Sequence, residues 1–189
     1  MTTPPSPSTV AEWRAFLSDF NARHINSDEV REAIEDQRQV ISKERLEAGW
    51  AGAEPAGEEA IVAAEERLGT RLPLSYRNFL HVSDGWEDIG SVDLFQVGDI
   101  GWFADLDADL IEAWSDSDSF VDQLALLKRC LLIGDDDGGS GCYWLLHADS
   151  VAENGEWTAY VWWPGDGDDP EPHHDFAAMV RGCGALLKS

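Results

Sequence analysis

The sequence predicts an α+β fold, in which a mostly antiparallel sheet has helices packed on it, together with an N-terminal helical extension. Up to about residue 85, apolar side chains recur at helical spacing. After that point, short apolar runs alternate with turns rich in Gly and Asp, and one amphipathic helix closes the chain. Helices followed by a run of strands are typical of a sheet covered by helices.

The composition indicates a folded, strongly acidic protein. Its 189 residues include 13 Lys and Arg against 37 Asp and Glu, which gives a net charge of −24. Hydrophobic residues make up 43 % of the chain, so a core can form despite the charge. The length suits one domain, or one domain with an added segment.

The charge argues against two classes of partner. A nucleic-acid backbone is bound by clustered Lys and Arg side chains, and the sequence has no such cluster. Anionic membrane surfaces are disfavoured for the same reason. No apolar run approaches the roughly 20 residues of a membrane span, and residues 1–9 lack the basic and apolar segments of a signal peptide.

The three cysteines, Cys130, Cys142 and Cys183, are widely spaced and form no CxxC motif. This spacing argues against a disulfide framework or a structural zinc site, and it favours reduced thiols in a cytoplasmic protein. A catalytic thiol needs a nearby cation. Only Cys130 has one in sequence, from Lys128 and Arg129, and it falls in an apolar run that predicts a buried strand.

The first 48 residues are expected to form a tail and two helices. Residues 1–9 are rich in Pro, Ser and Thr, which is typical of a flexible tail. Thr9 and Glu12 match a capping box, and a helix should follow to about residue 22. A second helix is expected over residues 27–48, with an apolar stripe of Val30, Ile34 and Ile41.

The main domain is expected to span residues 49–189, after an extension of residues 10–48. The segment 58–68 has helical spacing, and Gly69 suits the left-handed position that ends a helix. Pro73 fits the first turn of another helix, where the missing N–H has no cost. Tyr76, Phe79 and Leu80 would form the buried face of that helix.

The second half of the chain is expected to supply the sheet. Apolar runs predict strands over residues 91–97, 130–133, 142–147 and 157–163. The segment GDDDGGSG would form a hairpin loop between the second and third of these strands. Residues 108–114 and 176–187 are expected to be helical, and residues 120–127 fit either a helix or a strand.

The negative charge is concentrated in this strand-bearing half. Between Asn78 and Val180, 23 acidic residues face only two cations, Lys128 and Arg129. One interpretation is a solvated face that promotes solubility. The other is a docking surface that attracts a basic partner over long distances. The second is favoured by the large aromatic residues between the acids and by the clustering of acids in predicted loops.

We therefore predict a partner-binding surface made of acidic and tryptophan side chains in these loops. The candidate residues are Asp84, Trp86, Glu87, Asp88, Trp102, Asp105, Asp107, Asp109, Asp135, Asp136 and Asp137.

No motif indicates catalysis, so no catalytic residue, metal or cofactor is expected. Asp105, Asp107 and Asp109 have the spacing of a calcium loop, but Leu110 replaces the required Gly. His173 and His174 are adjacent, so they point in different directions and seldom share one metal. No nucleophile motif is present, and the glycine-rich segment carries three acids, which would repel phosphate.

Residues 50–85 carry a family resemblance. The pattern is W-x4-P-x5-I-x3-E-x2-L-G-x2-L-P-x2-Y-x2-F-L-x4-G, and it resembles the signature of the SUKH superfamily. The hairpin and the last strand and helix also resemble that family, so that the similarity extends over about residues 50–187. Fungal members are regulatory scaffolds. Bacterial members are typically immunity proteins that block a toxin, often a nuclease.

The resemblance implies an α+β fold and a non-catalytic role. Together with the acidity, it predicts a cytoplasmic immunity protein, monomeric or weakly dimeric, that binds a basic toxin domain and no nucleic acid or membrane. Two alternatives stay open. One is a regulatory or scaffold module without a toxin partner, and the other is an enzyme of unrecognised type. The matching positions are mostly structural and identify no toxin-binding residue.

Overall fold

The computed structural model describes residues 6–38, 40–90, 92–136 and 141–186. None of the helices described there is long and apolar enough to cross a membrane. The described helices are α1 (Val10–His24), α2 (Asp28–Glu35), α3 (Lys43–Ala48), α4 (Glu58–Leu68), α5 (Leu74–Leu80), α6 (Phe103–Leu106), α7 (Ala108–Ser115), α8 (Val121–Leu127) and α9 (Phe176–Leu186), with 3-10 turns η1 (Asp118–Phe120) and η2 (Pro164–Asp166).

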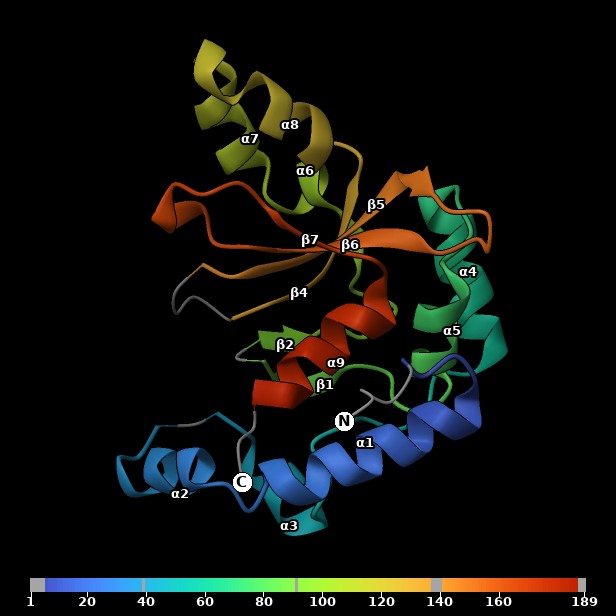
Figure 1. The fold of residues 1–189 in the computed structure, drawn as a ribbon, viewed down its shortest axis with the longest axis vertical. Coiled ribbons are helices and arrows are strands. Elements are labelled where there is room, and N and C mark those ends of the chain that lie inside the picture. The colour runs from blue at the N-terminus through green and yellow to red at the C-terminus, as the bar shows by residue number, and fades with distance from the viewer. Residues whose placement is uncertain (1–5, 39, 91, 137–140, 187–189) are drawn as a thin grey trace.

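One sheet runs through the centre of the molecule (Figure 1). Its strands are β1 (Trp86–Ile89), β2 (Val92–Leu94), β3 (Gly101–Trp102), β4 (Cys130–Asp135), β5 (Tyr143–Val151), β6 (Trp157–Trp162) and β7 (Glu171–His173). The order is β1-β2-β4-β5-β6-β7, with β3 also paired to β4, and every described pairing is antiparallel. The predicted α+β class is therefore confirmed.

The central strands are buried on both faces because their side chains alternate between two apolar clusters. In β4, Leu131 and Ile133 join the larger cluster, which packs against α1, α4, α5 and α9. Cys130 and Leu132 point to the opposite face and join a smaller cluster. The segment containing α6, α7 and α8 covers that second face (Figure 1).

The N-terminal helices share the main core with the rest of the chain. Trp13 of α1 is fully buried, with its ring centroid 5.5 Å from those of Phe79 in α5 and Phe176 in α9. Asn21 ties α1 to the chain after α3, since its side chain donates to the Gly49 carbonyl and accepts from the Ala51 N–H. The buried apolar side chains of the extension thus belong to the same core as those of the sheet domain.

The helix ends follow the expected local chemistry. The capping box of Thr9 and Glu12 is present at the start of α1. Gly49 and Gly69 end α3 and α4 in the left-handed conformation, with φ of 68° and 70°. Pro73 immediately precedes α5 as its N-cap. Of the predicted tail, residues 1–5 lie outside the described residues. The carbonyl oxygen of Ser8 accepts a hydrogen bond from the Asn78 side chain of α5.

The prediction of one helix over residues 27–48 is wrong. The first helix, α2, ends at Glu35, and Gln37 then adopts a left-handed φ of 58°. Ser42 starts a separate helix by accepting from the Arg45 N–H. The break turns Ile41 into the core at 3 % exposure, whereas Ile34, placed in the predicted stripe, is 52 % exposed.

Other elements differ in detail. The ambiguous segment 120–127 is helical, with η1 leading into α8. Strands β1, β3 and β7 were not predicted, and the expected strand over residues 91–97 is the shorter β2. The hairpin of β4 and β5 is confirmed, although residues 137–140 of its connection lie outside the described residues, as do Ser91 and Leu187.

A buried carboxylate links the β5–β6 turn to the start of α5. Glu156 is 8 % exposed, and its oxygens accept from the backbone N–H and the hydroxyl of Ser75, at 2.9 and 2.5 Å. Ser75 is the second residue of α5, where free backbone N–H groups favour a negative charge.

Replacing Glu156 with Ala is expected to lower the free energy of unfolding by about 2–3 kcal/mol, because the buried donors of Ser75 lose a charged acceptor. Urea denaturation measures this change. Glu153→Ala is the matched control, since Glu153 is exposed on the same turn and should shift stability by less than about 0.5 kcal/mol. Equal effects of the two substitutions would contradict the assigned role of Glu156.

Candidate functional site

The helical segment on the second face of the sheet is held by a polar contact as well as by apolar packing. Asp107 accepts from the Leu110 N–H and so caps α7. Its other oxygen accepts from the Tyr143 hydroxyl of β5 at 2.6 Å. Burial and the charges of Asp107, Asp135 and Asp136 raise the pKa of Tyr143, so the phenol stays protonated and keeps donating.

This segment carries acidic residues and no basic ones. Residues 103–127 contain seven Asp and Glu, and neither Lys, Arg nor His. Asp107 is half-buried, and the other six side chains are exposed: Asp105, Asp109, Glu112, Asp116, Asp118 and Asp122.

The connection between β6 and β7 extends the same surface. Gln123 of α8 donates to Asp169 at 2.6 Å, and the Trp162 indole donates to the Asp168 carbonyl at 3.2 Å. Asp166, Asp168 and Asp169 are exposed, and residues 164–169 contain no cation. We call residues 103–127 and 164–169 together the acidic lobe. It presents nine exposed carboxylates.

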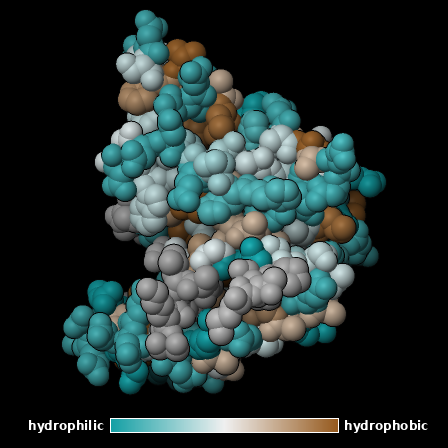
Figure 2. All heavy atoms as spheres, in the orientation of Figure 1, coloured by the Kyte–Doolittle hydropathy of each residue, from teal (hydrophilic) through white to brown (hydrophobic). Residues whose placement is uncertain are grey.

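Apolar side chains lie among these carboxylates. Leu106 and Val121 are 49 % and 57 % exposed. Trp114 and Phe120 are half-buried and stack on each other, with ring centroids 4.1 Å apart, and Trp114 also contacts Trp162 edge-on. In Figure 2 the helical part of the lobe forms the upper projection, where hydrophilic atoms surround a few hydrophobic ones.

Acidic residues elsewhere are more evenly matched by cations. On α4, Glu58 and Glu65 both pair with Arg77. Arg129, one of the two cations between residues 78 and 180, is held by both oxygens of Asp149 at 2.7 and 2.8 Å. That contact lowers the pKa of Asp149. The net negative charge is therefore most concentrated at the acidic lobe.

Four of the predicted surface residues have structural roles away from the lobe. Trp86 is 2 % exposed and belongs to the main core, so its side chain offers no surface to a partner. Asp84 accepts from the Val97 N–H at 2.7 Å. Glu87 accepts from the backbone and hydroxyl of Ser42. Asp88 forms an ion pair with His24.

The remaining predicted residues divide between the lobe and the sheet. Asp105 and Asp109 are exposed on the lobe, whereas Asp107 is committed to its two hydrogen bonds. Trp102 is half-buried under the Arg129 guanidinium, which lies 5.3 Å from its ring centroid. Asp135 and Asp136 are half-buried near Tyr143, and Asp137 lies outside the described residues.

The predicted list omits seven exposed acids of the lobe: Glu112, Asp116, Asp118, Asp122, Asp166, Asp168 and Asp169. A signal for most of them was present in the sequence. Residues 103–127 form a stretch without a single cation, and this feature, more than the local spacing of Asp105, Asp107 and Asp109, marks the helical part of the acidic lobe.

The cysteines are poorly suited to act as nucleophiles. Burial raises the pKa of Cys130 and Cys142 to about 12, and that of Cys183 to about 11. At neutral pH these thiols are therefore protonated, whereas the nucleophilic form of cysteine is the thiolate. Cys130, the one cysteine with cations beside it in sequence, is fully buried in β4.

Comparison of the sequence with models of known protein families identifies its family. The model of the SMI1/KNR4 family (SUKH-1) matches residues 55–179, which is more than half of the chain. The chain belongs to the SMI1/KNR4 family. No curated protein matches the sequence.

The family match includes the whole sheet and the acidic lobe, and it leaves out α1, α2 and α3. The SUKH superfamily includes toxin-immunity proteins, and SMI1/KNR4 proteins are generally non-catalytic immunity or regulatory proteins. The resemblance detected over residues 50–85 is therefore confirmed.

Asp84 allows a test of how the acidic residues near β1 contribute to stability. Burial raises the pKa of Asp84, and the nearby Asp99 adds to this, although the Val97 N–H opposes it. The folded state thus holds a proton on Asp84 more tightly than the unfolded state does. The contribution of Asp84 to stability should therefore fall as pH rises from the unfolded pKa of about 3.9 through the higher folded value.

Asp84→Asn keeps an oxygen acceptor for the Val97 N–H and removes the charge. The stability of this variant relative to wild type is therefore expected to rise across that pH window and to level off above it. Denaturation midpoints measured from pH 3 to pH 7 give this difference, in which the titration of other groups cancels. A difference that is constant with pH would contradict the assignment.

Proposed function

We propose that this protein is an immunity protein that binds and neutralises a cognate toxin through its acidic lobe. The observation that carries the proposal is the density of charge: nine exposed carboxylates and no Lys, Arg or His in residues 103–127 and 164–169. The superfamily includes toxin-immunity proteins, which makes a toxin the most direct choice of partner.

The lobe is suited to a basic partner, such as a toxin domain that acts on nucleic acid. The active surface of such a domain must attract phosphates, and carboxylates held on a protein can occupy it instead. Attraction between the two surfaces speeds their encounter. Because screening acts over about 8 Å at physiological ionic strength, this acceleration should weaken as salt is added.

Exposed apolar groups on the lobe would supply short-range contacts. Leu106 and Val121 are about half exposed in the free protein, so a partner that covers them removes apolar area from water. The stacked pair of Trp114 and Phe120 belongs to the same segment. A stable complex of ordinary size buries roughly 800 Å² on each partner, and such interfaces are rich in aromatic anchors.

Neutralising four carboxylates of the lobe should slow capture of the cognate toxin domain, which is to be sought in the neighbouring reading frames. The variant carries four substitutions: Asp109→Asn, Glu112→Gln, Asp116→Asn and Asp118→Asn. We expect the association rate constant to fall at least about tenfold at low ionic strength, with a smaller change in dissociation. Stopped-flow or surface-based binding kinetics measure both, and co-expression with the toxin measures rescue of growth.

The matched control removes the same net charge elsewhere. It replaces four exposed glutamates outside the lobe with Gln, at Glu44, Glu59, Glu66 and Glu153. The control should associate nearly as fast as wild type, because the local field at the lobe is retained. Equal slowing of both variants would show a general effect of net charge and reject the lobe as the interface. A regulatory module would be favoured by two results together. The protein would not rescue growth from any neighbouring toxin, and it would bind several partners with modest affinity.

A further inference from the structure

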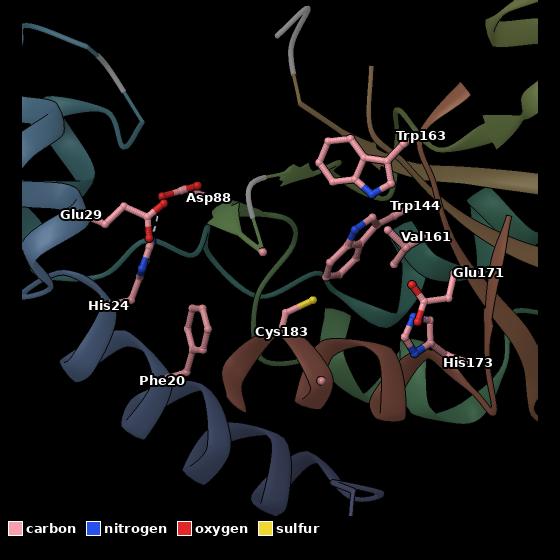
Figure 3. Close-up of a pocket in the computed structure, with 12 residues that line it drawn as sticks. Phe20, His24, Glu29, Asp88, Trp144, Val161, Trp163, Glu171, His173 and Cys183 are labelled. Carbon is pink, nitrogen blue, oxygen red and sulfur yellow. Dashed lines mark ion pairs between the residues drawn. The ribbon is translucent and has the colours of Figure 1, made fainter. Parts of the chain in front are cut away.

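A second surface feature lies between the N-terminal helices and the sheet, and none of its described lining residues belongs to the acidic lobe. It is a cavity of about 490 Å³, within the usual range for ligand pockets. Figure 3 shows His24 and Phe20 of α1 on one side, Trp144 and Trp163 across from them, and Glu171 and His173 of β7 on a third side.

Buried polar atoms at this cavity lack hydrogen-bond partners. His24 is only 3 % exposed, and its Nε2 atom lies 3.0 Å from Asp88 Oδ2. Its Nδ1 atom has no hydrogen-bond partner among the described residues, and neither has Nε2 of His173. Buried imidazole nitrogens are almost always hydrogen-bonded. These two nitrogens belong to residues that line the cavity, and they are unsatisfied positions to which a hydrogen-bond donor could bind.

The loop that carries Asp88 is held in a constrained conformation. Asp88 has a left-handed φ of 54°, which a non-glycine residue rarely adopts, and its N–H donates to Asp93 at 2.7 Å. Gly90, at φ 61°, approaches α9 so closely that a Cβ atom would lie 2.7 Å from the Cys183 sulfur. The constraint places the Asp88 carboxylate beside His24, and strained residues of this kind cluster at binding sites.

The chemistry of the lining indicates a cation. Among the described residues that line the cavity, Glu29, Asp88 and Glu171 contribute carboxylates, and none is Lys or Arg. Glu29 and Glu171 are exposed at the rim, while Asp88 lies deeper. The half-buried Trp163 offers an aromatic face, which attracts cations. The described residues include no group of His, Cys, Asp and Glu able to hold a metal ion.

We propose that this cavity receives the guanidinium group of an arginine side chain from the protein partner. A guanidinium is planar and carries five N–H donors, so it can stack on Trp163 and still donate to carboxylates on different walls. An ammonium has three donors and no planar face. The proposal rests on the proposed function for its choice of a basic protein as the partner.

Part of the cavity wall lies outside the residues that match the family model. Phe20, His24 and Glu29 precede the family match of residues 55–179, and Cys183 follows it. The N-terminal helices therefore complete a pocket that the matched domain alone would leave open on one side. This arrangement gives the α1 and α2 helices a role in choosing the partner.

The binding of arginine is tested without the toxin, using the capped amino acid N-acetyl-arginine-N-methylamide. Titration is followed through the indole N–H resonance of Trp163 by NMR. We expect saturable binding with a Kd of the order of ~1–10 mM, as suits a ligand of this size. The capped lysine analogue should bind at least about fivefold more weakly, and the uncharged citrulline analogue should not saturate.

Two substitutions distinguish the effect of the pocket on probe binding from the effect of net charge. Glu171→Gln should weaken binding of the arginine probe about tenfold, since a charged hydrogen bond is lost. Glu66→Gln on α4 removes the same charge from an exposed site and should leave binding unchanged. An unshifted Trp163 resonance, or equal binding of the arginine and citrulline probes, would overturn the proposal.

The toxin complex distinguishes this proposal from the proposed function. Glu171→Gln should raise the dissociation rate constant of the complex about tenfold and leave association nearly unchanged, unlike neutralisation of the lobe. Probe binding without any effect of Glu171→Gln on the complex would show that the cavity takes a small guanidinium compound, and would overturn the partner assignment. If the protein neutralises the toxin but does not bind the arginine probe, the arginine pocket is rejected and the proposed function stands.

Discussion

Burial of the central strands on both faces is the constraint on which the rest of the structure depends. Alternate side chains of β4 and β5 enter two separate apolar clusters, so each face needs its own cover. On one face, α1, α5 and α9 meet through the rings of Trp13, Phe79 and Phe176. On the other, the described residues that cover the sheet come from the short segment with α6, α7 and α8, and the outer side of this segment faces water.

This arrangement explains why so much charge is tolerated in one place. The inner side of the segment contributes Phe103 to the second cluster, and Asp107 bonds to Tyr143 of the sheet. The outer side carries six exposed acids that repel each other, and the β6–β7 connection adds three more. Such repulsion lowers stability. The fold holds the segment through its apolar side, which leaves these nine carboxylates facing water.

Local chemistry predicted much of the fold, because caps and apolar spacing act over a few residues. The capping box at Thr9, the left-handed Gly49 and Gly69, and the buried face of Tyr76 and Phe79 all followed from neighbouring residues. The broken helix at residues 36–42 did not, since burial of Ile41 depends on tertiary packing. The charge pattern suggested a docking surface for a basic partner, and the family resemblance suggested a toxin as that partner.

The site was harder to predict because an acidic side chain can face water or a distant partner. Asp84 and Glu87 resemble surface acids in sequence, yet they bond to Val97 and Ser42. Those partners lie far along the chain, and no local pattern shows them. The cation-free stretch of residues 103–127 is a property of the sequence itself, and it identifies the lobe.

Amide hydrogen exchange of the complex with the cognate toxin tests whether the acidic lobe is the interface. We expect binding to protect residues 103–127 and 164–169, while α4, on the other side of the sheet, exchanges as in the free protein. Protection confined to α4 and its neighbours, with unchanged exchange across the lobe, would contradict this expectation.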